Sequence, residues 1–275
     1  MHRVCRISPL LAALSYHSLS CDSVKLPPDV TGLKETVTGR VFPFTRGDAS
    51  SPNPTSLYSV QCRCMMQLCI LPQARAYAYG VYTDERLQHT ARRLLSASST
   101  TSTPLTPVGL VKALLDECQS ESSGFTTSGG SLQLVLVMHR DIDGEHMAHG
   151  FHNSIEKRLK KLRGLTPPKG DTTLDEVLAL VSVIKKLPLK AGEEVVFTWK
   201  SSEGGVAVSV GGRVVIRLIN PLVCRALFEV YVGEGAVSSY GARSFAENVF
   251  ARAQKGTEYS SAEVTKEYAK IGMLW

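Results

Sequence analysis

An arginine interrupts an apolar, sulfur-rich segment whose composition predicts a β-strand. Arg63 stands within a run of valine, cysteine and methionine at residues 60–66. A guanidinium that faces the interior needs an anionic partner. Neither this predicted strand, residues 57–69, nor the next, residues 74–83, contains an acidic residue. A ligand carboxylate can supply the missing charge; the alternative is an arginine on the solvent face of a sheet edge.

Tyr77 lies in the second of these strands, beyond a turn at Pro72. Arg63 and Tyr77 both carry odd numbers, so an antiparallel hairpin with an even pairing sum places them on one face of the sheet. A guanidinium and a phenol on one face form a charge-assisted clamp for a carboxylate. The alternative is a tyrosine that only packs in the core.

Three histidines recur at intervals of three in a segment predicted to be helical, residues 145–162. His146, His149 and His152 therefore share one broad helix face. Metal or haem ligation requires that face to line a pocket and a second shell to orient the rings. No further ligand follows at a recognisable spacing, so a solvated face is the favoured interpretation, ahead of substrate contact. We predict no metal and no cofactor, with these histidines as the candidates if haem or a metal is bound.

The elements that position these residues are antiparallel strands with helices between and after them. Thr173 and Glu176 have capping-box spacing, the glycine pairs 204–205 and 211–212 suit hairpin turns, and Asn220-Pro221 suits a helix start. The order predicts an α+β fold: an antiparallel sheet with a layer of helices on one face. The default ligand site is the cleft where strand ends meet the helices. Further strands are expected at 132–139, 194–200, 206–210 and 213–219, and further helices at 84–95, 109–118, 221–232 and 243–254.

The chain is predicted to be one domain, residues 32–275, behind a presequence and lead-in at 1–31. Serine- and threonine-rich segments near 96–107 and 119–131 are expected to be loose insertions. The first 21 residues contain Arg3 and Arg6 and no acidic residue, which is typical of a mitochondrial presequence. A secreted protein, suggested by a short apolar core, and an untargeted cytoplasmic protein are the alternatives.

Composition excludes several classes of protein. The 275 residues carry a formal charge of +6, and no stretch approaches the about 18 apolar residues of a membrane span. The one basic run, residues 157–163, lies at a predicted helix C-terminus, where cations complement the helix dipole; we therefore predict no nucleic-acid partner. Seven cysteines without repeated spacing predict buried, reduced thiols.

Several segments resemble the chalcone isomerase-like family. Residues 57–63 are similar to the family's strand that ends in an arginine, and residues 76–82 to its aromatic–glycine–valine–tyrosine strand. Residues 220–233 resemble the capped helix that ends in a glycine, with a Val-Ser turn at 237–238. The resemblance implies an open-faced antiparallel sheet with helices on one side.

The resemblance also implies a choice among three groups of family members: true chalcone isomerases, fatty-acid-binding proteins, and mitochondrial proteins, some of which are associated with haem. The isomerase uses a tyrosine and an asparagine near the start of the long helix; matching through Gly144 puts Met147 and Ser154 there, with Asn153 one residue away. A methionine donates no hydrogen bond, so these three residues are candidates for the cleft and not for catalysis.

The fatty-acid-binding members hold a carboxylate with an arginine and a tyrosine, positions that Arg63 and Tyr77 match. We therefore expect a non-catalytic binder of a fatty acid or similar apolar carboxylate in an organelle. An intramolecular lyase acting on an α,β-unsaturated carbonyl is the alternative, and a mitochondrial haem-binding protein is the second alternative.

Overall fold

The computed structural model describes residues 32–47, 54–64, 74–99, 104–121, 130–163, 172–200 and 203–255. The predicted presequence, residues 1–31, lies outside these ranges, and so do the end of the predicted domain from residue 256 and part of each predicted insertion. Over the described ranges, no helix combines the length and apolar character needed to cross a bilayer.

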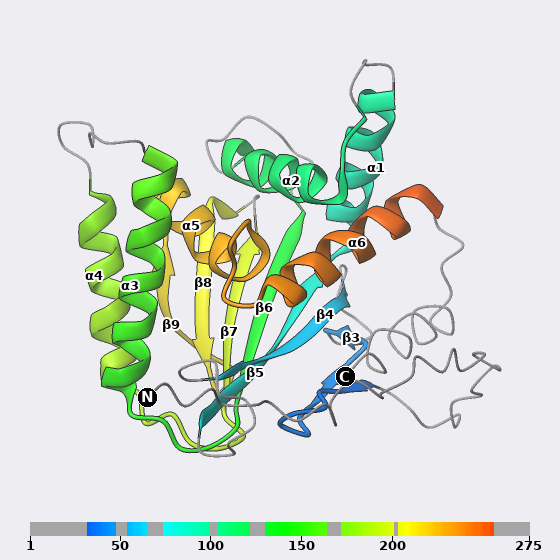
Figure 1. Cartoon of the computed structure of the whole chain (residues 1–275). Helices are drawn as coiled ribbons and strands as arrows, with labels where there is room; N and C mark the ends of the chain where they lie inside the picture. Colours follow the sequence, from blue (N-terminus) through cyan, green and yellow to red (C-terminus); the bar gives the residue numbers. More distant parts are fainter. Residues whose placement is uncertain are drawn as a thin grey trace, which may run out of the picture. The chain divides into compact units, whose positions relative to one another are not determined.

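A curled antiparallel sheet of seven strands carries the fold, in the order β3-β4-β5-β6-β7-β8-β9 (Figure 1). Gly211 and Gly212, with φ of 54° and 78°, form the tight turn between β8 and β9. The strands are β3 (Thr45–Arg46), β4 (Thr55–Cys64), β5 (Arg75–Thr83), β6 (Ser131–Met138), β7 (Glu194–Lys200), β8 (Gly205–Val210) and β9 (Arg213–Leu218). A separate pair consists of β1 (Gly32–Lys34) and β2 (Val41–Pro43).

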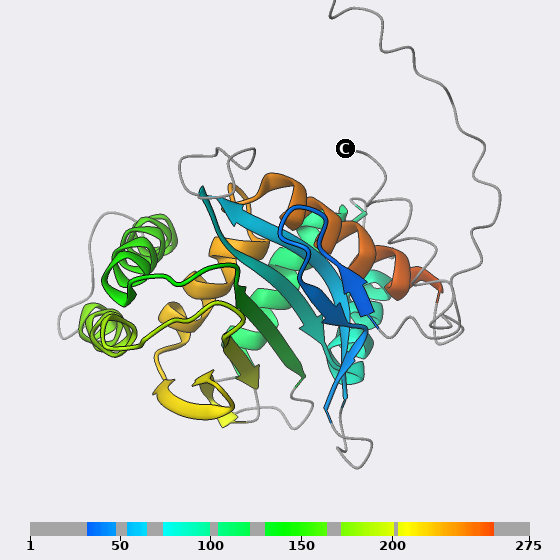
Figure 2. The same cartoon turned by 90° about the horizontal axis from the view of Figure 1, so that it is seen from below.

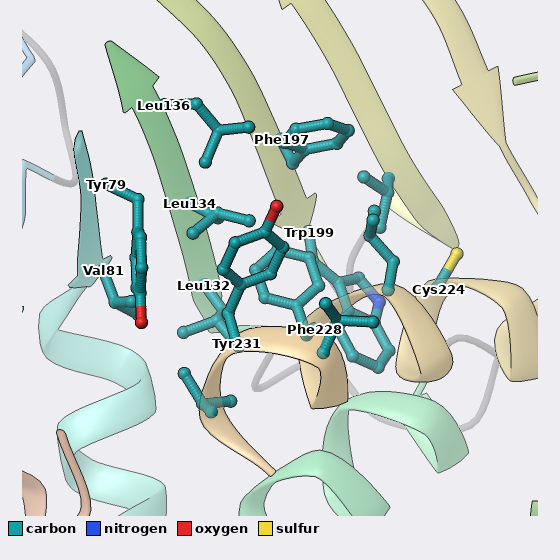
Figure 3. Close-up of a cluster of buried hydrophobic side chains, with 14 of the residues drawn as sticks. Tyr79, Val81, Leu132, Leu134, Leu136, Phe197, Trp199, Cys224, Phe228 and Tyr231 are labelled. Atoms are coloured by element: carbon teal, nitrogen blue, oxygen red, sulfur yellow. The ribbon is translucent and has the colours of Figure 1, made fainter. Parts of the chain in front are cut away.

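Helices cover one face of the sheet, which confirms the predicted α+β class (Figures 1 and 2). They are α1 (Glu85–Ser99), α2 (Pro107–Glu121), α3 (Gly144–Arg163), α4 (Thr173–Lys185), α5 (Pro221–Val232) and α6 (Ser239–Lys255). Helix α5 packs directly on the sheet, with Phe228 against Trp199 and Tyr231 against Tyr79 at ring-centroid distances of 5.5 and 5.1 Å. Figure 3 shows Tyr231 standing on α5 with its hydroxyl directed away from the helix. These two contacts fix the position of α5 against β5 and β7.

The opposite face of the sheet has a smaller apolar cluster, which β2 covers in part. Phe42 is fully buried there together with Ala78 and Tyr82. A Cβ on Gly80 would stand 2.7 Å from the Phe42 ring, so a glycine in β5 is what lets Phe42 approach this closely. The expected open face is therefore partly closed by the β1–β2 pair.

The serine-rich segments are more helical than expected. Helix α1 continues to Ser99, and α2 takes in Pro107 and residues 119–121, so the predicted loose insertions are wrong over these residues. The hydroxyls of Ser98 and Ser99 donate to the carbonyls of Leu95 and Ser96 at 2.8 and 2.7 Å. A serine hydroxyl that donates to a carbonyl of its own helix does not draw backbone groups into a competing non-helical conformation.

The capping box predicted at Thr173 is also wrong. The N-cap of α4 is Thr172, which makes no side-chain cap hydrogen bond. Glu176 instead accepts hydrogen bonds from the backbone N–H groups of Ile219 and Asn220, and Thr173 accepts one from the Asn220 amide. The two residues thereby join α4 to the loop before α5 by supplying acceptors to N–H groups of that loop.

Candidate functional site

A cavity of about 410 Å³ lies where the ends of β4 and β5 meet α3 and α5. This volume is within the range of small-molecule sites in proteins, about 300–1,000 Å³. Buried and mostly apolar side chains form its floor, whereas its rim is exposed. The lining residues are Arg63, Cys64, Ala76, Tyr77, Arg140, Ile142, Asp143, His146, Met147, His149, Gly150, Phe151, Ser154, Val230, Tyr231 and Val237.

Arg63 and Tyr77 stand directly opposite each other in the β4–β5 pair, and both line the cavity. The even pairing sum expected from the sequence is thus observed. Arg63 is half-buried, and its Nη1 donates to the Val237 carbonyl at 3.3 Å. Within the described part of the chain, its guanidinium makes no ion pair. A cation in a largely apolar cavity therefore has no anionic partner among the residues that the structure describes.

Tyr77 is joined to a second phenol, that of Tyr231 on α5, at an oxygen–oxygen distance of 2.9 Å. Burial raises the pKa of both phenols above its usual value of 10. Both hydroxyls therefore stay protonated near neutral pH. One of the two protons makes the internal hydrogen bond, so the pair retains one donor for another acceptor. No local pattern in the sequence links Tyr231 to Tyr77, which lies 154 residues away.

The loop that carries Val237 is held from α3 by a buried arginine. Arg158 donates to the carbonyls of Glu234, at 2.5 Å, and Gly235. The Val237 N–H donates to the Val230 carbonyl at 2.8 Å. Although Arg158 belongs to the basic run at the C-terminal end of α3, it is only 9 % exposed. Its guanidinium satisfies loop carbonyls and so fixes the acceptor of Arg63.

Two of the three predicted cleft residues line the cavity. Met147 is buried in its wall, and Ser154 is half-buried there. The prediction that Asn153 belongs to the cleft is wrong. This residue is exposed and does not line the cavity, and its amide contacts Nε2 of His149 at 2.9 Å. The helical period puts Met147 and Ser154 on one side of α3, and Asn153 falls about 100° away from Ser154.

Comparisons with known proteins establish the architecture. No family model matches the sequence, and no curated protein matches it. Among solved structures, the crystal structure of a fatty-acid binding protein from Arabidopsis thaliana superposes with a TM-score of 0.59. The identity is 19%, and the match covers 80% of this chain and 98% of that chain. The chain has the chalcone isomerase-like fold. Function still has to be argued from the cavity, because one fold hosts many functions.

Two of the three predicted histidines stand at the cavity rim. His146 and His149 line both the cavity and a groove between α3 and α4, whereas His152 lines only the groove. Over the described residues, no group of three or more His, Cys, Asp or Glu side chains has an arrangement that could hold a metal ion. The three-residue spacing therefore does not produce a metal centre from these residues.

The cysteines of the described residues differ in state. Cys64, on the cavity wall, is disulfide-bonded, so the expectation of reduced thiols is wrong at this position. Cys62, Cys118 and Cys224 are not disulfide-bonded. Burial raises the pKa of the Cys62 thiol to about 11 and that of Cys224 to about 12. Both remain protonated at neutral pH, and a protonated thiol is a poor nucleophile.

Proposed function

We propose that this protein binds a fatty acid or a similar apolar carboxylate in the cavity, without catalysing a reaction on it. The observation that carries the proposal is the Arg63 guanidinium, which reaches an apolar cavity and has no ion pair among the described residues. A buried carboxylate is tolerated only when it is paired and hydrogen-bonded, and Arg63 and the two phenols supply both. The fold shared with a fatty-acid binding protein supports the same conclusion.

The rest of the cavity suits an aliphatic chain. Met147, Phe151 and Val230 are buried in its wall. Each methylene transferred from water to such surroundings contributes about 0.8 kcal/mol. The carboxylate then provides orientation, and the chain provides most of the affinity.

The cavity wall favours binding over an intramolecular lyase activity. Met147 lines the wall at the position where the resemblance places the isomerase tyrosine. A thioether cannot donate the hydrogen bond that would orient a reacting phenol. The proposal assigns no haem to His146 or His149, which stand at the exposed rim.

The proposal is tested by comparing a fatty acid with the fatty alcohol of equal chain length. Both compete with a fluorescent fatty acid for the purified protein. The alcohol is expected to bind about ten-fold or more weakly, because it lacks the charge-assisted hydrogen bonds, worth about 1.5–3 kcal/mol each. Equal displacement by acid and alcohol would show that no carboxylate clamp exists.

The phenol pair gives a second prediction. Tyr77→Phe and Tyr231→Phe are each expected to weaken fatty-acid binding by about 0.5–1.5 kcal/mol, or roughly two- to ten-fold, because each removes one neutral hydrogen-bonding group. Because the phenols share a hydrogen bond, the double variant should deviate from the sum of the single effects. Fluorescence titration measures this, with Tyr240→Phe, outside the cavity, as the control. Unchanged affinity in both single variants contradicts a role for the pair.

We extend the proposal to location: residues 1–31 direct import into mitochondria, on the strength of their acid-free, arginine-containing composition. A fluorescent protein fused behind residues 1–35 is expected to accumulate in mitochondria. Replacing Arg3 and Arg6 with glutamate should abolish import. Diffuse or secretory fluorescence of the unaltered fusion rejects this part and leaves the ligand proposal untouched.

A further inference from the structure

A groove of about 400 Å³ runs between α3 and α4, which lie side by side in both views (Figures 1 and 2). Its apolar lining consists of Ala148, Leu178 and Val181. The ion pair between Glu145 and Lys185, at 2.5 Å, stands at one end. Leu178 is 48 % exposed, an unusual degree for a leucine beside a groove. The groove thus presents apolar surface that no described residue covers.

The groove adjoins the cavity that contains Arg63. His146 and His149 line both, so this exposed stretch of α3 forms the border between the two spaces. Gly150 lies on the cavity rim at the same level, and a Cβ built there meets nothing within 4 Å. The His149 ring contacts the Asn153 amide one turn along the helix. The border between cavity and groove is therefore exposed, with open space beside Gly150.

We propose that the groove receives the distal part of the acyl chain whose carboxylate binds at Arg63. The inference rests on the proposed function and deepens it, because it assigns the ligand to long-chain rather than short-chain fatty acids. The chain leaves the cavity between His146 and His149 and lies against Ala148, Leu178 and Val181. Apolar contact with these side chains removes both the chain end and Leu178 from water.

Chain length then affects affinity in two stages. Within the cavity, each added methylene raises affinity by about four-fold, the value for complete burial. In the groove, which is open on one side, each methylene is only partly buried and adds about two-fold or less. A protein without the groove contact would show the first stage and then a plateau.

The test is a chain-length series on three forms of the full protein. Saturated fatty acids of about eight to about twenty carbons are titrated against wild type, Leu178→Glu and Leu174→Glu. Leu174 lies on the same helix, is 49 % exposed and does not line the groove, so it is a matched control for the added charge. Leu178→Glu is expected to bind the shortest acids as wild type does and to lose about ten-fold for the longest. Leu174→Glu should follow wild type throughout.

The outcomes separate the two proposals. If wild type binds no fatty acid of any length, the proposed function fails. The groove inference is overturned if the affinity of all three proteins depends on chain length in the same way, or if both variants lose the same affinity for long acids. In either case the proposal that Arg63 binds the carboxylate is unaffected. Circular dichroism and thermal unfolding check that Leu178→Glu is folded. Val181→Gln, in the same groove, reports the same difference if the first variant is unstable.

Discussion

Replacing Arg63 with alanine is expected to lower the affinity for a fatty acid by at least about ten-fold. The variant leaves a ligand carboxylate in an apolar cavity without its cation, and charged hydrogen bonds contribute about 1.5–3 kcal/mol each. The only hydrogen bond that Arg63 makes within the described residues is to the Val237 carbonyl. The free energy of unfolding should therefore change little, and the loss should appear in fluorescence titration of the ligand.

Lysine at the same position separates charge from geometry. Arg63→Lys should recover little of the affinity, because an ammonium group does not reproduce the planar fork that binds both carboxylate oxygens. The fatty alcohol of equal length should bind wild type and Arg63→Ala alike, since it has no charge to lose. Equal fatty-acid affinity in wild type and Arg63→Ala would place the binding site elsewhere on the protein.

Gly144→Ala is expected to destabilise the domain by about 1–3 kcal/mol, the usual cost of inserting atoms into a packed site. A Cβ at Gly144 would stand 2.6 Å from the Ile184 carbonyl oxygen and 2.8 Å from those of Lys185 and Leu187. These are backbone atoms at the end of α4, so no side-chain rotation relieves the contact. Urea unfolding measures the loss, and fatty-acid affinity should fall too, because α3 forms a wall of the cavity.

Gly150→Ala is the matched control on the same helix. Nothing stands within 4 Å of a Cβ at Gly150, and alanine is a better helix former than glycine by about 0.8–1.0 kcal/mol. This variant should therefore be as stable as wild type or more so. A Gly144→Ala protein as stable as Gly150→Ala would show that the first turn of α3 does not pack against the end of α4.

The sequence by itself determined the features whose physics is local. The hairpin glycines and the Asn220-Pro221 helix start depend on a few adjacent residues, and the Asn220 side chain accepts from the Leu222 N–H at 3.0 Å as its type predicts. That Arg63 and Tyr77 share a face of the sheet followed from their both being odd-numbered, because the two residues belong to one hairpin and strand side chains alternate between faces.

Only the tertiary structure decided the contacts between distant elements. Periodicity shows which face of a helix is apolar, but not which partner that face meets or at what rotation. Three contacts join residues 43 or more positions apart. They are the hydrogen bond between Tyr77 and Tyr231, the bond from Arg158 to the loop before Val237, and the bond from the Ile219 N–H to Glu176. Each contact depends on how a whole helix is set against the sheet or its neighbour. Packing of the entire core fixes that placement, and no short segment encodes it.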